Sequence, residues 1–281
     1  MLTILRSGTT EDNNRLRLTA GELSFDDTKK ALRLHDDQTL GGFEILGERA
    51  YVLPTGPGPE EIVAGDETLG YYGRLATEDF VSGDVLASMV GLSMGSAIVT
   101  DEWFKFARNG KVLYIPVTPI RSSISWEQLY QAGLVYGVDG PGPYPSPTQT
   151  PVNQATQVSV QSYPFIVRLM TTGFEDPITG WSGDRGNPPQ SGGEWNDLLY
   201  RVASNTPLTN AADIWDNVPS TVMRVSGGTT DGKICWCQET YDSDTTKRFF
   251  RGSQGLTDFY PVSATVVNQY YGWRPVLELV K

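Results

Sequence analysis

The segment Gly91-Leu-Ser-Met-Gly95 has the G-x-S-x-G spacing of a nucleophile elbow, in which the serine attacks an acyl carbon. That chemistry needs a histidine base within hydrogen-bond reach, and hydrolases with this elbow place the histidine after the serine. The single histidine, His35, precedes Ser93 and falls in a different part of the chain. The spacing is therefore interpreted as a helix C-cap followed by a turn, and no catalytic residue is predicted.

The only two cysteines, Cys235 and Cys237, form a C-x-C pair. A bridge between residues two apart on a strand would close a small, strained loop, so two reduced thiols and synthesis in a reducing cytoplasm are expected. A zinc site needs three or four nitrogen or sulfur ligands, and the sequence supplies no other cysteine and no nearby histidine. The pair is predicted to lie in the core or at an interface, and no metal site or cofactor is predicted.

Acidic residues cluster at 26–27, 36–37 and 242–244. A calcium ion needs six to eight oxygen ligands in one place, and none of these clusters has the EF-hand spacing. They are interpreted as solvated turns. A calcium ion held between loops of the larger domain is the alternative.

Residues 254–270 are rich in Tyr, Ser, Asn and Thr and carry little charge, a composition typical of recognition surfaces. The alternative is an ordinary surface loop. Trp236 and Trp273 are predicted to be core residues. The candidate ligand-binding residues of the segment are Gln254, Thr257, Asp258, Tyr260, Ser263, Asn268 and Tyr270.

The formal net charge of -11 argues against nucleic acid as a partner, because the chain would repel phosphates, and against attraction to anionic membranes. No stretch approaches the 18 apolar residues of a membrane span, so no membrane insertion is expected. Residues 1–8 lack the apolar region of a signal peptide, so export by that route is not expected.

Short alternating segments joined by polar turns are typical of residues 1–47, including a hairpin of residues 21–25 and 31–35. This segment is too small to bury much core alone, so partner chains are expected. The run of prolines and glycines after residue 53 cannot hold a helix or a central strand. The predicted organisation is a small all-β domain over 1–47, a linker over 48–67 and a larger domain over 68–281.

The larger domain combines strand and helix signals. Asn109-Gly110 between two apolar runs predicts a hairpin. Ser125 and Gln128 have the spacing of a capping box, and the helix they begin is expected to end at Gly133. A helical apolar stripe is formed by Trp195, Leu198, Leu199 and Val202. The predicted fold class is α+β with long loops.

The first 47 residues resemble the N-terminal domain of phage major tropism determinant proteins. The resemblance is carried by Arg6-Ser-Gly-Thr-Thr10, by residues 20–28, and by Leu32-Arg-Leu-His-Asp-Asp-Gln-Thr39 with Gly41-Gly42. Asp37 stands where glycine is common in the family, and Ser7 departs from the first motif. The resemblance implies a domain that trimerises and attaches a fibre to the particle.

The late Arg251-Gly252 and the closing Gly272-Trp-Arg274 resemble the end of the C-type-lectin-like fold of tropism determinants and formylglycine-generating enzymes. The resemblance implies that residues between 252 and 272 lie where such proteins present their ligand surface. The enzymes among them use catalytic cysteines, and the placement of Cys235 and Cys237 does not match that use.

Together the resemblances imply a homotrimeric virion protein, made in the host cytoplasm and released by lysis, that is not an enzyme. Its expected partners are other virion proteins, through residues 1–47, and a host cell-surface glycan or protein. The alternatives are a head or collar decoration protein without receptor binding, and a depolymerase or esterase.

Overall fold

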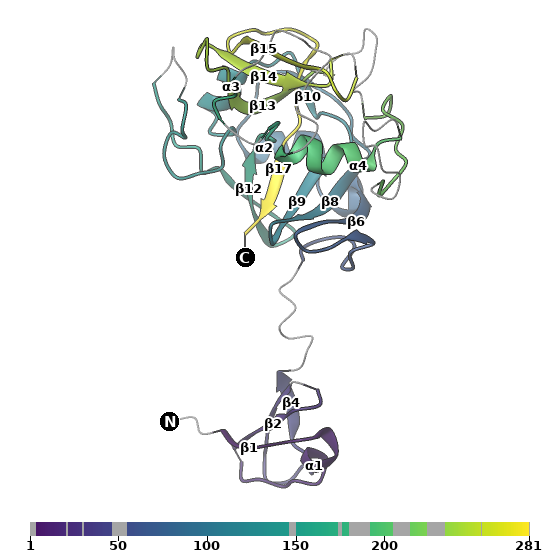
Figure 1. Ribbon diagram of the computed structural model, residues 1–281. Helices are drawn as coiled ribbons and strands as arrows, with labels where there is room; N and C mark the ends of the chain where they lie inside the picture. Colours follow the sequence, from purple (N-terminus) through teal and green to yellow (C-terminus); the bar gives the residue numbers. More distant parts are fainter. Residues whose placement is uncertain are drawn as a thin grey trace. The chain divides into compact units, whose positions relative to one another are not determined.

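The computed structural model describes residues 4–20, 22–29, 31–46, 55–145, 150–173, 176–179, 192–204, 214–223, 234–253 and 255–280. The chain divides into two compact units, Met1–Thr55 and Gly56–Val280. Both units are rich in strands, and the helices of the described residues are short (Figure 1). The fold is therefore β-rich, with less helix than an α+β class suggests.

The first unit contains a four-stranded sheet in the order β1 (Ile4–Gly8), β2 (Leu23–Asp26), β3 (Ala31–Leu34) and β4 (Phe43–Leu46). The antiparallel hairpin of β2 and β3 confirms the prediction, whereas β1 pairs with β2 in parallel. The prediction of an all-β segment misses one helix, α1 (Thr10–Asn14). It begins at a capping box of Thr9 and Asp12, which satisfies two backbone N–H groups within very few residues.

The interior of the first unit is mainly polar. Asp26 is fully buried and accepts a hydrogen bond from Arg33 Nη2 at 2.8 Å. Beside this pair, Ser24 Oγ lies 2.9 Å from His35 Nε2. Among the side chains of this unit that the structure describes, Leu23 and Ala31 are the buried apolar ones. Hydrogen bonds and one ion pair therefore organise a unit that buries little apolar surface.

The second unit begins at Gly56, so residues 56–67 are part of it and not of the linker predicted over 48–67. Buried Lys105 donates from Nζ to the carbonyl oxygens of Gly56, at 3.3 Å, and Pro59, at 2.5 Å. The hydroxyl of Tyr114 donates to the carbonyl oxygen of Pro57 at 2.8 Å. Residues 56–59 are not part of a strand, so their carbonyl oxygens can accept hydrogen bonds from the buried Lys105 and Tyr114 side chains.

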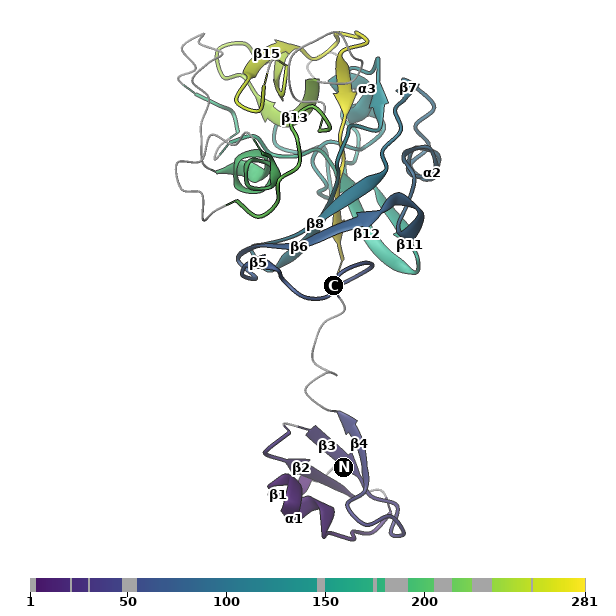
Figure 2. The same ribbon diagram turned by 90° about the vertical axis from the view of Figure 1, so that its right-hand side faces the viewer.

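Two sheets form the second unit (Figures 1 and 2). The seven-stranded sheet has the order β11-β12-β17-β9-β8-β6-β5, and the six-stranded sheet has the order β15-β14-β13-β16-β10-β7. The strands of the first are β5 (Ala64–Gly65), β6 (Leu69–Ala76), β8 (Glu102–Arg108), β9 (Lys111–Pro116), β11 (Gln157–Val160), β12 (Tyr163–Arg168) and β17 (Val276–Leu279). The strands of the second are β7 (Ser96–Ala97), β10 (Arg121–Ser122), β13 (Ile234–Thr240), β14 (Lys247–Arg251), β15 (Phe259–Ser263) and β16 (Tyr271–Trp273).

The helical segments are η2 (Thr77–Asp79), α2 (Gly83–Met89), α3 (Trp126–Gln131), the π-helical η3 (Trp195–Leu199) and its continuation α4 (Tyr200–Val202). The capping box of Ser125 and Gln128 is present, and Gly133 follows α3 with φ of 72°. The stripe predicted from Trp195 to Val202 is helical and buried, although its first five residues have the wider π-helical turn.

Both faces of the seven-stranded sheet are buried, and β8 illustrates how. Trp103 and Ala107 face one apolar cluster, which contains α3, while Phe104 and Phe106 face a second one, which contains η3 and α4. The first cluster also contains Trp236 and Trp273, both fully buried, which confirms the assignment of these residues to the core. The two clusters hold the sheets and the short helices in fixed positions.

The turn at Asn109-Gly110 needs a left-handed backbone conformation, and this requirement can be tested by substitution. Both residues have positive φ, 52° and 73°, as a two-residue hairpin turn requires. A Cβ on Gly110 would meet no atom within 4 Å, so Gly110→Ala adds backbone strain alone. We expect the free energy of unfolding to fall by about 1–2 kcal/mol, measured in urea by tryptophan fluorescence. Gly255→Ala is the control, since that site is open and its φ is not left-handed. Equal effects of the two changes would contradict this account of the turn.

Candidate functional site

The middle of the predicted recognition segment, residues 259–263, forms an edge strand, β15. β15 pairs with β14 alone and ends the six-stranded sheet (Figure 1). Phe259 and Pro261 are buried, whereas Tyr260 and Val262, on the opposite face of the strand, are half-buried. Residues 259–263 are therefore a sheet edge with one partly exposed side, whereas residues 255–258 and 264–270 are turns and irregular segments, as the alternative of an ordinary surface loop expects.

The candidate residues differ in accessibility. Asp258 is buried, with 6% of its surface exposed, so its carboxylate is not presented to a partner in this conformation. Ser263 Oγ and Thr265 Oγ1 share a hydrogen bond of 3.0 Å, and Asn268 Oδ1 accepts one from the Tyr270 N–H at 3.0 Å. Gln254 lies outside the described residues. Thr257, Tyr260, Ser263 and Tyr270 are half-buried, and Asn268 is exposed.

The structure joins Tyr260 to residues that the sequence does not single out as site residues. The ring of Tyr260 lies 5.9 Å from that of Phe250, which lies 5.9 Å from that of Tyr271. Tyr271 in turn stacks on buried Trp236 at 5.0 Å. These four residues form what we call the aromatic row, and its two tyrosines are partly exposed. Strand pairing between β14 and β15, a non-local feature, is what makes Phe250 and Tyr260 neighbours.

Ser93 does not have the setting of a catalytic nucleophile. It follows α2 and precedes β7, whereas an elbow lies between a strand and the helix after it. Gly91 has φ of 69°, and its N–H donates to the Ser88 carbonyl, which confirms the C-cap interpretation. His35 belongs to the first unit, where it is buried beside Ser24.

Cys235 and Cys237 are both buried and are not bridged, as predicted. Burial raises the pKa of both thiols, and for Cys237 the carboxyl of Glu239 adds to the increase. A raised pKa keeps the thiols protonated, so they are poor nucleophiles and poor metal ligands. In the part of the chain that the structure describes, no group of three or more His, Cys, Asp or Glu side chains is arranged to hold a metal ion. None of the helices there combines the length and the apolar character needed to cross a membrane.

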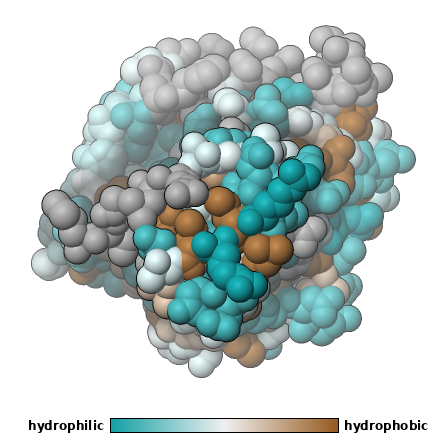
Figure 3. Space-filling view, turned by 90° about the horizontal axis from the view of Figure 1, so that it is seen from below, coloured by the Kyte–Doolittle hydropathy of each residue, from teal (hydrophilic) through white to brown (hydrophobic). Residues whose placement is uncertain are grey.

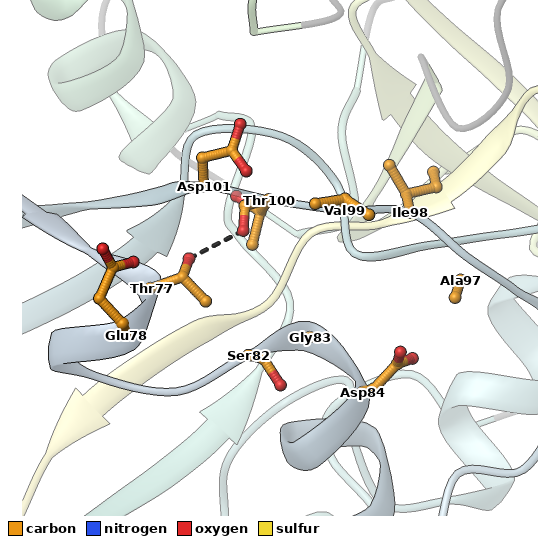
Figure 4. Close-up of a pocket in the computed structure, with 10 residues that line it drawn as sticks. All are labelled: Thr77, Glu78, Ser82, Gly83, Asp84, Ala97, Ile98, Val99, Thr100 and Asp101. Carbon is orange, nitrogen blue, oxygen red and sulfur yellow. Dashed lines mark hydrogen bonds between the residues drawn. The ribbon is translucent and has the colours of Figure 1, made fainter.

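A groove of about 420 Å³ lies between residues 77–84 and 97–101 (Figure 4). The hydroxyl of Thr77 donates to the carbonyl oxygen of Thr100 at 2.8 Å and joins the two segments. Glu78 and Asp101 are exposed, and Asp84 pairs with Arg121 at 2.9 Å. Exposed carboxylates of this kind contribute little binding energy each. The lining has acidic and small side chains but no histidine or cysteine, so it offers no paired base and nucleophile.

Glu239 is a buried carboxyl with a perturbed pKa, and its Oε1 accepts the N–H of Thr172 at 2.6 Å and that of Gly173 at 3.3 Å. Burial raises the pKa of Glu239 to about 8, and the carboxyl of Asp176 contributes to the increase. Burial also raises the pKa of Asp176, to about 6. Glu239 is therefore largely protonated at neutral pH, next to the buried thiol of Cys237.

Comparison with known proteins yields no matching family model and no matching curated sequence. Among solved structures, the chain is similar to the Major Tropism Determinant U1 variant, with 12% identity and a TM-score of 0.21, and to the P3c variant, with 10% identity and a TM-score of 0.21. Each comparison covers 99% of this chain and 100% of the other.

Glu239 predicts a dependence of stability on pH. Its pKa is raised in the folded state, so its contribution is fully favourable below its ordinary pKa of 4.5 and is lost as pH rises through about 8. Glu239→Gln removes this loss, because the amide keeps an acceptor for the Thr172 N–H and carries no charge. We expect the variant to gain stability over the wild type between pH 5 and pH 8, by at most about 1.4 kcal/mol per pH unit, in urea denaturation. Glu61→Gln, at an exposed site, is the control. A constant difference across this range would contradict the assignment.

Proposed function

We propose that the chain is a structural protein of a phage particle, in a fibre, spike or collar, that recognises the surface of the host cell. The observation that carries the proposal is the aromatic row, with its two partly exposed tyrosines at the edge of the six-stranded sheet. The resemblance of residues 1–47 to the N-terminal domain of tropism determinants supports the same class of protein.

The aromatic row has the physical properties of a recognition surface. Tyrosine offers a large contact area at a small cost in conformational entropy, and its hydroxyl can exchange hydrogen bonds with a partner. Phe250 and Trp236 are buried beneath the two tyrosines, so the rings are held in position before a partner arrives. A host glycan or protein could pack against such a preorganised surface.

We also propose that the second unit has a C-type-lectin-like fold.

The first unit is proposed to form a homotrimer and to attach the chain to other virion proteins. Leu34, Leu40 and Phe43 are exposed although few apolar side chains are buried in this unit. The view from below shows brown apolar residues gathered in the middle of the surface nearest the viewer (Figure 3). Apolar surface on so small a unit is stabilised when partner chains cover it. The proposed location is the virion, after synthesis in the host cytoplasm and release by lysis.

We further propose that the chain is not an enzyme. The setting of Ser93 between a helix and a strand, and the burial of both thiols, support this.

The aromatic row gives the first test. Tyr260→Ala removes its outermost ring, and we expect about tenfold weaker adsorption to host cells, the effect of losing one strong interface contact. The measurement is the adsorption of labelled full-length chain to a panel of bacterial isolates, followed by titration on every isolate to which it adheres.

Tyr163→Ala is the matched control, because Tyr163 is also half-buried but lies on β12 in the other sheet. Unchanged adsorption of the Tyr260 variant would overturn the assignment of the row. A chain that adheres to no isolate and binds only other virion proteins would support a decoration role instead.

The oligomeric state gives the second test. We expect sedimentation equilibrium of the full chain to report three times its mass of 30.9 kDa. Leu40→Asp combined with Phe43→Asp should reduce this to the monomer, since charges would have to be buried in the interface. Val63→Asp, at an exposed apolar site of the second unit, should leave the trimer intact. A monomeric wild type would refute the proposed assembly.

A further inference from the structure

A second, more polar cavity is lined mainly by strands of the seven-stranded sheet and shares no residue with the aromatic row. Its volume is about 230 Å³, smaller than the roughly 300–1,000 Å³ of sites for drug-sized ligands. Residues of β8, β9, β12, β13 and β17 line it, together with the 109–110 turn and the segments at 171 and 194. The residues used below are Asn109, Lys111, Arg168, Glu194, Gln238 and Glu278.

The charged groups of this cavity are already paired, including Arg108, whose guanidinium binds the nearby Asp197 carboxylate at 2.8 Å. Arg168 has five N–H donors, and all five have partners. Nε and Nη2 bond to Glu278 Oε2 at 3.1 and 3.0 Å, and Nη2 also bonds to Glu194 Oε1 at 2.5 Å. Nη1 bonds to Glu194 Oε2 at 2.8 Å and to the Leu169 carbonyl at 3.1 Å. Lys111 Nζ contacts Glu278 Oε1 at 2.6 Å.

The pair of Arg168 and Glu194 is charged at neutral pH. Burial alone would raise the pKa of Glu194, but the neighbouring Arg168 guanidinium lowers it overall. A buried ion network seldom adds net stability compared with apolar residues of similar size. Here it places several rigid polar atoms around a small opening, which suits the binding of a ligand.

The polar groups of the lining that remain for a ligand include both hydrogen-bond donors and acceptors. Gln238 donates through Nε2 to the Leu169 carbonyl at 2.7 Å, which leaves its amide oxygen as an acceptor. The Lys111 ammonium and the Asn109 amide, both on exposed residues, supply donors at the rim. An anion would be repelled by Glu194 and Glu278, and a cation by Arg168 and Lys111. The best ligand is uncharged and has groups that both donate and accept.

We propose that this cavity binds one ring of a neutral saccharide through its hydroxyl groups. A hydroxyl donates and accepts at once, as the alternating donors and acceptors of the lining require. The small volume admits a single ring with the rest of a glycan outside. The inference goes beyond the proposed recognition by the aromatic row and does not depend on it.

The test is saturation-transfer NMR on the full chain with the methyl glycosides of glucose, galactose, mannose and N-acetylglucosamine. We expect at least one to bind, in the presence of EDTA as well as without it, because no metal ion is involved. Methyl glucuronoside and glucosamine, the anionic and cationic probes, should bind more weakly. Lys111→Met and Asn109→Gly should each weaken binding about tenfold, the effect of losing one hydrogen bond to a charged or well-placed group. Glycine is compatible with the left-handed backbone at position 109.

Lys247→Met is the matched control, since Lys247 is also half-exposed and paired, with Asp244 at 3.2 Å, but on β14. Tyr260→Ala should leave glycoside binding unchanged, so failure of one site can be told apart from failure of the other. The proposal is overturned if none of the four glycosides binds, if EDTA abolishes binding, if a charged probe binds more tightly, or if the Lys111 and Asn109 variants bind as the wild type does.

Discussion

The second unit is organised around the buried guanidinium of Arg251. It hydrogen-bonds to Thr172 Oγ1, Asn196 Oδ1, the Tyr200 hydroxyl and the Leu256 carbonyl, and so joins β14 to two segments distant in sequence and to the turn that follows it. Its plane also lies 5.5 Å from the rings of Trp195 and Phe259. An arginine buried without these partners would be strongly destabilising, so the segments must assemble around it. These contacts also fix the position of the next strand, β15, which contains Phe259.

Buried polar groups play a similar part elsewhere. Asp26 and Arg33 pair inside the first unit, and Arg168 binds two carboxylates and a backbone carbonyl in the second. Such groups contribute more to a unique arrangement than to stability, because desolvation offsets much of the attraction. The consequence for function is rigidity. Both the aromatic row and the polar cavity are lined by side chains whose positions are held before any ligand binds.

Local signals in the sequence predicted local structure well. The Asn109-Gly110 hairpin, the capping box at Ser125 and the stripe from Trp195 to Val202 depend on residues within one or two turns of each other. Predictions are less accurate where the position of a residue depends on contacts with residues far away in the sequence. The Pro/Gly-rich residues 56–59 are held by Lys105 and Tyr114, and the buried position of Asp258 depends on the fold around it. The short helix α1 has a local signal, the capping box of Thr9 and Asp12, which the prediction of an all-β domain does not use.

Many of the strands, turns and helix starts, and the two core tryptophans, can be predicted from short stretches of sequence, because backbone propensity and apolar periodicity act over short distances. The residues of the aromatic row are also visible in the sequence, but nothing in it indicates that their rings meet. It is the folded chain that places Phe250 between Tyr260 and Tyr271, and that brings Arg168 from β12 to Glu194 and Glu278. Such contacts depend on strand order and register, which join residues up to 110 positions apart and leave no trace in any short window.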